Sequence, residues 1–214
     1  MENFIKILQS FNSKERFFLI RKVLGNKEFN LSEKFREELF GILDLPIPQD
    51  VQNVFVAMDY HLDWLYASLV KTFNNELKPP FSNKDKAIKG HQEDIDFIIV
   101  FESDRKFNVI LIEAKGVTGW TNKQLNSKAK RLIEIFGKEG NRWKKVIPHF
   151  ITLSPKPPPK KIKILNNNTW LRPDIKKNWL KLPLPKDLKK VSRCNKESES
   201  DKNGEYWIIE KRPF

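Results

Sequence analysis

One stretch of the chain, residues 93–115, constrains the fold more than any other, because two apolar runs there flank a short polar segment. The runs, 95–101 and 107–112, are rich in β-branched residues, which is typical of adjacent antiparallel strands rather than of a helix. Both runs are apolar at successive positions, so both faces of each strand are expected to be covered. The sequence therefore predicts a β-hairpin in the middle of a sheet.

Charged residues stand at the ends of this predicted hairpin. Asp96 lies at the start of the first run, and Glu113 and Lys115 follow the second, where they share a face because side chains alternate along a strand. A carboxylate withdrawn from water is costly unless it is paired or binds a metal. The three residues therefore form either a set of ion pairs at a sheet end or a divalent-cation site. Surface ion pairs contribute only about 0–1 kcal/mol, which favours the cation.

The order of these residues resembles the core of the PD-(D/E)XK nuclease superfamily, which has the restriction endonuclease-like fold. The resemblance covers residues 90–132 and consists of an Asp heading one strand, a hairpin, and Glu-Ala-Lys closing the next strand 17 positions after Asp96. A Gly-containing turn and a helix follow. A second Glu-X-Lys triplet, Glu76-Leu77-Lys78, lies in a polar stretch before two prolines and is interpreted as surface.

The resemblance implies a set of catalytic roles. Asp96 and Glu113 are expected to bind Mg²⁺, for which Mn²⁺ could substitute, with the Ala114 carbonyl as a third ligand. Such a cation prefers oxygen ligands and assists phosphodiester hydrolysis. Lys115 is expected to position or deprotonate the attacking water. Gln124, on the helix that follows, is a further catalytic candidate.

Other acidic residues could support this site. Asp94 lies two residues before Asp96 on the same face, and it is a candidate for a second metal or an alternative primary ligand. Glu93 is treated as secondary. Residues 54–73 are predicted to form a helix on which Asp59 and Asp63 share a face. Asp63 or Asp59 is expected either to approach the metal site, as the resemblance implies, or to belong to a solvated acidic face.

The segment after the hairpin is predicted to cross back to the sheet. Thr121 or Asn122 can cap a helix running to about Phe136, and residues 146–153 read as the strand that completes a strand–helix–strand crossover. Residues expected to contact nucleic acid lie on this helix and in the Pro- and Lys-rich segment 154–163: Lys123, Lys128, Arg131, Lys160 and Lys161. The alternatives are a solvent-facing helix surface and a solvated linker.

The whole chain is predicted to be α/β, with a restriction endonuclease-like mixed central sheet flanked by helices. Residues 1–75 are expected to form an N-terminal helical region on the core, residues 76–154 the core itself, and residues 155–214 a basic Pro-rich segment with a C-terminal β-hairpin, part of the same globule. That hairpin is predicted around Lys202-Asn203-Gly204, because Asn-Gly favours a tight turn. The fold also needs a strand before the one that bears Asp96, for which 78–83 and 86–90 are the candidates.

Charge indicates the class of partner. The net charge is +13, and it rises along the chain from −1 over residues 1–80 to +5 over 81–150 and +9 over 151–214. Such asymmetry is expected of a protein that meets nucleic acid, although a basic solvated face would look the same. A lone cysteine, Cys194, excludes an internal disulfide and a cysteine-rich zinc site. No apolar run is long enough to span a membrane, so a cytoplasmic protein without a membrane partner is expected.

These observations predict a Mg²⁺-dependent DNA endonuclease of the repair, restriction or mobile-element type. A second copy of the chain is a candidate partner, because cutting both strands with a single-site nuclease commonly takes two copies. The alternative is a catalytically inactive nuclease-fold module that binds nucleic acid or a protein. No Walker loop, zinc-finger spacing or Gly-Xaa-Ser-Xaa-Gly motif is present.

Overall fold

The computed structural model describes residues 3–11, 31–48, 54–74, 80–84, 86–90, 93–116, 120–158, 170–171, 178–185 and 187–211. Its elements are α1 (Phe4–Ser10), α3 (Glu33–Leu43), β1 (Phe55–His61), α4 (Leu62–Phe73), β2 (Asp94–Ser103), β3 (Lys106–Ala114), α5 (Asn122–Phe136), β4 (Val146–Ser154), β5 (Trp179–Lys181), β6 (Lys189–Cys194) and β7 (Tyr206–Lys211). The chain is therefore a mixed α/β protein. None of its described helices is long and apolar enough to cross a membrane.

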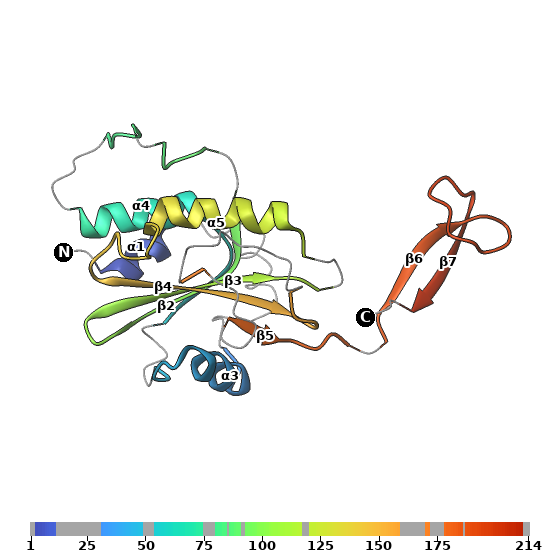
Figure 1. Cartoon of the computed structure of the whole chain (residues 1–214), viewed down its shortest axis with the longest axis horizontal. Helices are drawn as coiled ribbons and strands as arrows, with labels where there is room; N and C mark the ends of the chain where they lie inside the picture. The colour runs from blue at the N-terminus through green and yellow to red at the C-terminus, as the bar shows by residue number, and fades with distance from the viewer. Residues whose placement is uncertain are drawn as a thin grey trace.

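A five-stranded mixed sheet, in the order β1-β2-β3-β4-β5, forms the body of the molecule (Figure 1). Strands β1, β2 and β3 pair antiparallel, and β4 and β5 continue the sheet parallel to β3. The predicted hairpin is confirmed as β2 and β3, with neighbours on both sides. Asp104 and Arg105 form its turn with φ of 52° and 62°, a left-handed pair that matches the twist of two antiparallel strands.

The strand before the hairpin is not where the sequence predicted it. Residues 54–73 were predicted to be one helix, but residues 55–61 form β1 and only residues 62–73 form α4. Strand β1 pairs along its length with β2, which satisfies backbone groups that a helix would have bonded internally. The additional strand is therefore β1, and residues 80–84 and 86–90 contain none.

Two apolar layers enclose the sheet. Helices α1, α4 and α5 cover one face and α3 covers the other, as Figure 1 shows. On the α3 side, the rings of Phe40 and Phe101 lie edge to face at 5.2 Å. Helix α5 has the predicted bounds: Thr121 caps it by accepting the Gln124 N–H, and Leu132 is fully buried within its predicted stripe. The β3–α5–β4 crossover is confirmed.

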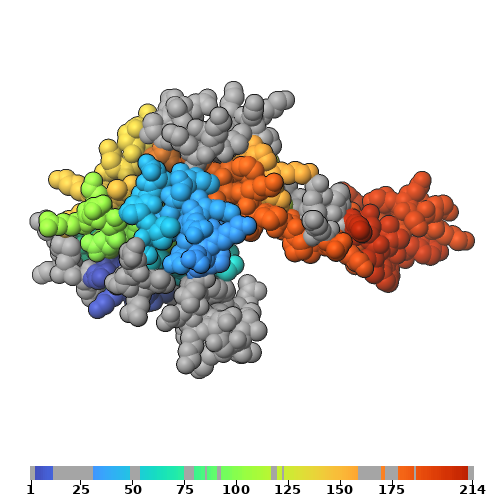
Figure 2. All heavy atoms as spheres, turned by 90° about the horizontal axis from the view of Figure 1, so that it is seen from below, coloured from blue at the N-terminus to red at the C-terminus, as the bar shows by residue number. Residues whose placement is uncertain are grey.

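The two predicted C-terminal strands are confirmed as the antiparallel pair β6 and β7. Residues 195–205 connect them, and Asn203-Gly204 lies in a turn within that connection, closed by the Gly204 N–H donating to the Asp201 carbonyl, rather than forming a two-residue hairpin loop. The pair forms a two-stranded sheet of its own. A Cβ at Gly204 would overlap the carbonyl oxygen of Cys194, so the turn requires glycine there. The hairpin was expected to be part of the same globule as the core; Figures 1 and 2 show it projecting from the sheet-and-helix body.

Candidate functional site

The ends of β2 and β3 bring the two predicted metal-binding carboxylates together. Phe97 on β2 pairs with Ile112 on β3, so the next step of the same antiparallel register sets Asp96 opposite Glu113. The backbone N–H of Ala114 donates a 2.7 Å hydrogen bond to Oδ2 of Asp96. Asp96 is therefore anchored to the Glu-Ala-Lys segment itself.

Glu113 is the most deeply placed member of this pair, with 7% of its surface exposed. Burial raises the pKa of the Glu113 carboxyl above its ordinary value. The positive charge of Lys128 opposes that shift, the negative charge of Asp96 adds to it, and Lys115 opposes it. The pKa of Glu113 therefore depends on the three other charged groups at this end of the sheet.

Two lysines that follow Glu113 in the chain, one just after β3 and one on α5, lie near different oxygens of its carboxylate. Lys115 Nζ lies 3.9 Å from Glu113 Oε1, and Lys128 Nζ lies 3.7 Å from Glu113 Oε2. Both separations are ion-pair distances that exceed a normal hydrogen bond, and Oε2 is a buried atom without a hydrogen-bond partner. Asp96, Glu113 and Lys115 therefore converge, and an oxygen of Glu113 retains capacity for another ligand.

Lys128 comes to this cluster from helix α5. Its ammonium group also donates to the backbone carbonyl of Asp94, so it links α5 to the start of β2. Only 11% of the Lys128 side chain is exposed. Lys128 was predicted to contact nucleic acid. In the structure its side chain instead points into the protein, toward Glu113.

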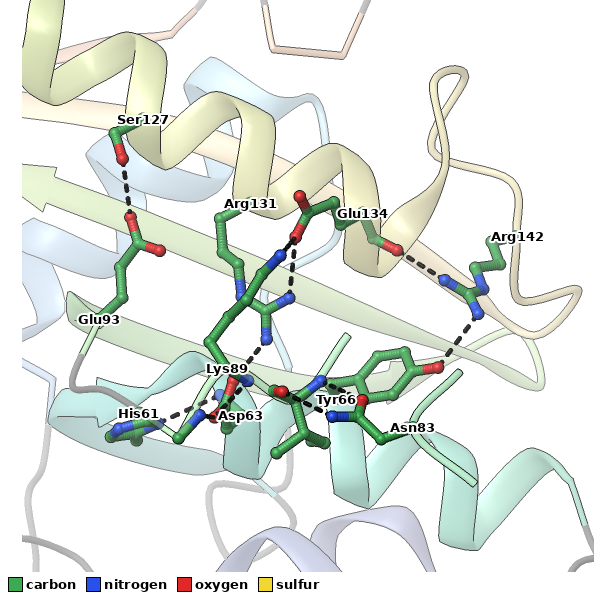
Figure 3. Close-up of polar contacts among 12 residues, drawn as sticks. His61, Asp63, Tyr66, Asn83, Lys89, Glu93, Ser127, Arg131, Glu134 and Arg142 are labelled. Carbon is green, nitrogen blue, oxygen red and sulfur yellow. Dashed lines mark hydrogen bonds and ion pairs between the residues drawn. The ribbon is translucent and has the colours of Figure 1, made fainter. Parts of the chain in front are cut away.

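A second charged network lies beside the first, shown in Figure 3. Asp63 Oδ1 accepts a 2.5 Å hydrogen bond from Nη2 of Arg131, while Oδ2 accepts from the backbone N–H groups of Lys89 and Gly90 at 3.0 and 2.9 Å. Glu134 lies 3.1 Å from both Arg131 and the Lys89 ammonium. This network fastens α4, α5 and the segment before β2 to one another.

The network corrects two predicted roles. Asp63 was expected either to approach the metal site or to lie on a solvated acidic face, but it is buried and its oxygens bind Arg131 and backbone groups. Arg131 was expected at a nucleic-acid surface, but it is 3% exposed. Asp59 lies on strand β1 with φ of 47°, not on a helix, so it does not share a helix face with Asp63.

The other predicted residues lie around the cluster. Glu93 Oε1 accepts a 3.4 Å hydrogen bond from the Ser127 hydroxyl of α5 (Figure 3). Asp94 heads β2, while Lys123 and Gln124 are exposed in the first turn of α5. Lys160 and Lys161 lie outside the described residues.

The oxygens at this site fit one class of metal better than others. The described part of the chain contains no group of three or more His, Cys, Asp or Glu side chains placed to hold a metal ion. Mg²⁺ commonly takes one or two carboxylates and keeps several waters. The Asp96–Glu113 pair, with its buried unbonded oxygen, meets that requirement.

Comparison of the chain with models of protein families, with curated proteins and with solved structures finds no match. The site is therefore interpreted from its own geometry. What sequence reasoning missed is the pairing of Arg131 with Asp63 and the inward direction of Lys128. Their positions beside the apolar stripe of α5 were the available signal, because a long cation that flanks such a stripe is placed to reach a buried acid.

Proposed function

We propose that this protein is a metal-dependent nuclease that hydrolyses phosphodiester bonds of DNA. The observation that carries the proposal is the convergence of two carboxylates and a lysine at one end of the central hairpin. Asp96 is bonded to the Ala114 N–H at 2.7 Å, Glu113 lies across from it, and Lys115 Nζ is 3.9 Å from Glu113. Bringing three ionisable groups to the end of two apolar strands suits chemistry on an anionic substrate.

The topology supports the same proposal. The resemblance implies a strand before the one that bears the aspartate, and β1 occupies that place. It also implies a helix and a parallel strand after Glu-Ala-Lys, which α5 and β4 supply. The restriction endonuclease-like fold is therefore part of the proposal.

Each residue has a role in the proposed reaction. Asp96, Glu113 and the Ala114 carbonyl would hold the cation, which supplies Lewis-acid stabilisation of phosphate charge and a more acidic water. Lys115 would orient the attacking water or accept its proton. Lys128 favours the ionised form of Glu113, because its positive charge opposes the rise in pKa that burial causes. Lys128 thereby offsets part of the effect of burial on the Glu113 carboxyl.

Cleavage of a mixed substrate panel tests the proposal. Supercoiled plasmid, linear duplex, single-stranded DNA and RNA would each be incubated with Mg²⁺, with Mn²⁺ and with EDTA. We expect metal-dependent cleavage of DNA by the native chain and its loss in Lys115→Ala. Lys130→Ala, a change of an exposed lysine on α5, is the matched control. Equal cleavage by native protein and Lys115→Ala, or none by the native chain under any condition, would refute the assignment.

One observation favours a second candidate, a non-cleaving module that binds nucleic acid. Glu113 is flanked by Lys115 and Lys128, so its charge is balanced without a metal. Such a module would bind DNA with strong dependence on salt but equally with Mg²⁺ or EDTA, and Glu113→Gln would not affect binding. The substrate panel separates the two candidates, since only a nuclease yields products.

A further inference from the structure

The C-terminal hairpin presents an unusual face to solvent. Cross-strand pairing places six residues on one side of it, here called the Trp207 face: Lys189, Val191, Arg193, Trp207, Ile209 and Lys211. Its three apolar side chains are 67%, 63% and 60% exposed for Val191, Trp207 and Ile209. Adjacent exposed apolar side chains of this size are typical of a binding surface.

The opposite face of the hairpin is less exposed, apart from Tyr206, which is 50% exposed. Cys194 there is 1% exposed, Ile208 is half-buried, and Lys190 pairs with Glu210 at 2.9 Å. A two-stranded sheet usually buries its apolar side chains and exposes its polar ones. In this hairpin the apolar side chain of Trp207 is exposed instead. The hairpin also projects from the sheet-and-helix body (Figure 2).

Charge identifies the class of occupant. The Trp207 face carries three cations and no acidic residue. Lys189 and Lys211 are directly opposite each other, an arrangement of like charges that is destabilising unless an anion lies between them. Lys211 is 3.7 Å from Asp187, but 80% of the lysine and 85% of the aspartate side chain are exposed, so that ion pair can be exchanged for another anion at little cost.

At the other end of this face, the ring of Trp207 lies beside Arg193, whose guanidinium is fixed by hydrogen bonds. Arg193 is the cross-strand partner of Trp207, and its guanidinium donates to the carbonyls of Gly204 and Asn203 at 3.0 and 3.4 Å. An exposed indole between fixed positive charges suits an unpaired base, because every base has a face that stacks and a phosphate that follows it. A duplex offers no such free base face along its length.

We propose that the Trp207 face binds single-stranded nucleic acid, with a base stacked on Trp207 and phosphates held by Lys189 and Lys211. The inference rests on the proposed nuclease function, whose substrate strand this hairpin would hold. It adds a binding site outside the Asp96–Glu113 cluster, and it assigns the substrate class as DNA with unpaired bases.

Fluorescence anisotropy of the full-length chain tests this inference. The probe is a fluorescein-labelled oligothymidylate of about 16 nucleotides, within the length that one stacking platform binds, in EDTA and low salt. We expect Trp207→Ala to weaken binding at least about fivefold. Tyr206→Ala is the matched control, because it removes a neighbouring exposed ring from the opposite face, and it should leave affinity unchanged. Trp207→Phe should retain most of the binding.

Salt dependence tests the phosphate contacts. The double variant Lys189→Ala with Lys211→Ala should reduce the slope of log affinity against log salt by about 1.4, the value for two phosphates of a single strand. Circular dichroism checks that each variant is folded, which is expected because the substituted side chains point to solvent. An unchanged slope would show that the two lysines do not contact phosphates.

Several outcomes overturn the inference. They are no binding by the native chain in low salt, equal binding by Trp207→Ala, or equal weakening by Tyr206→Ala. A dimer that Trp207→Ala dissociates without changing oligonucleotide affinity would make this face a contact between copies and would also overturn it. Failure of the nuclease proposal is distinguishable: Trp207-dependent binding without any cleavage would leave the binding site standing, whereas cleavage unaffected by Trp207→Ala would leave the nuclease standing.

Discussion

Arg131 on α5 and Asp63 on α4 form a buried ion pair, with Nη2 and Oδ1 separated by 2.5 Å. The two residues are 68 positions apart in the chain. The backbone N–H groups of Lys89 and Gly90 complete the bonding of the same carboxylate. Because this pair joins three segments around the start of β2, it positions the strand that carries Asp96.

Removing Arg131 should therefore destabilise the fold strongly. Arg131→Ala leaves Asp63 buried without its cation, and loss of one partner of a buried pair costs about 3–5 kcal/mol. Urea denaturation at pH 7 measures the loss. Lys130→Ala, at the neighbouring exposed position of α5, is the control and should change the free energy of unfolding by less than about 0.5 kcal/mol. A loss below about 1 kcal/mol for Arg131→Ala would show that the pair is not structural.

Cation binding should depend on Asp96 and Glu113 together. Mg²⁺ that binds only the folded chain should stabilise it by about 2.7 kcal/mol at 100 times the dissociation constant. Thermal unfolding with and without Mg²⁺ measures this effect, which should vanish in Glu113→Gln and in Asp96→Asn. Glu102→Gln changes an exposed glutamate of the same hairpin and should preserve the shift. Equal Mg²⁺ stabilisation in all four proteins would place any bound cation elsewhere.

Lys128 should set the pH range in which Glu113 is ionised. Burial raises the pKa of Glu113 and the charge of Lys128 lowers it, so Lys128→Gln should raise that pKa further. If ionised Glu113 is needed for cleavage, the acidic limb of the pH–rate profile should move to higher pH. Lys130→Gln is the matched control. A limb that does not move, or that moves to lower pH, would mean that Lys128 does not act through Glu113.

His149 should make the fold sensitive to mild acid. Its Nε2 lies 2.9 Å from Oδ1 of Asn108, and burial lowers the pKa of His149 to about 4. The unfolded chain takes up the proton near pH 6.5, before the folded chain does, so stability should fall as the pH drops from 6.5 to 4, by up to about 3 kcal/mol.

Urea denaturation of the native chain and of His149→Gln at pH 7, 5.5 and 4.5 isolates this contribution. The raised pKa of Glu113 acts in the opposite direction, since its protonation in acid relieves the cost of burying a charge, but it acts equally in both proteins. The gap between the two proteins should therefore narrow, or change sign, as the pH falls. A constant gap would mean that His149 is protonated equally in the folded and unfolded chain.

Local patterns in the sequence were enough to place the elements around the candidate site. The paired apolar runs predict β2 and β3, the capping residue Thr121 and a 3.6-residue stripe predict α5, and the last two strand-forming runs predict β6 and β7. Asp96, Glu113 and Lys115 could be grouped for the same reason, because their places at strand ends follow from the hairpin alone.

Only the tertiary structure determined those features that depend on residues far apart in the chain. Residues 55–61 carry apolar spacing that suits either a helix or a strand, and the edge of β2 that was free to pair made them β1. The directions of Lys128 and Arg131 depended on buried acids supplied by Glu113 and Asp63. The energy of a charged side chain depends on the groups around it in space, and spacing along the chain does not specify those groups.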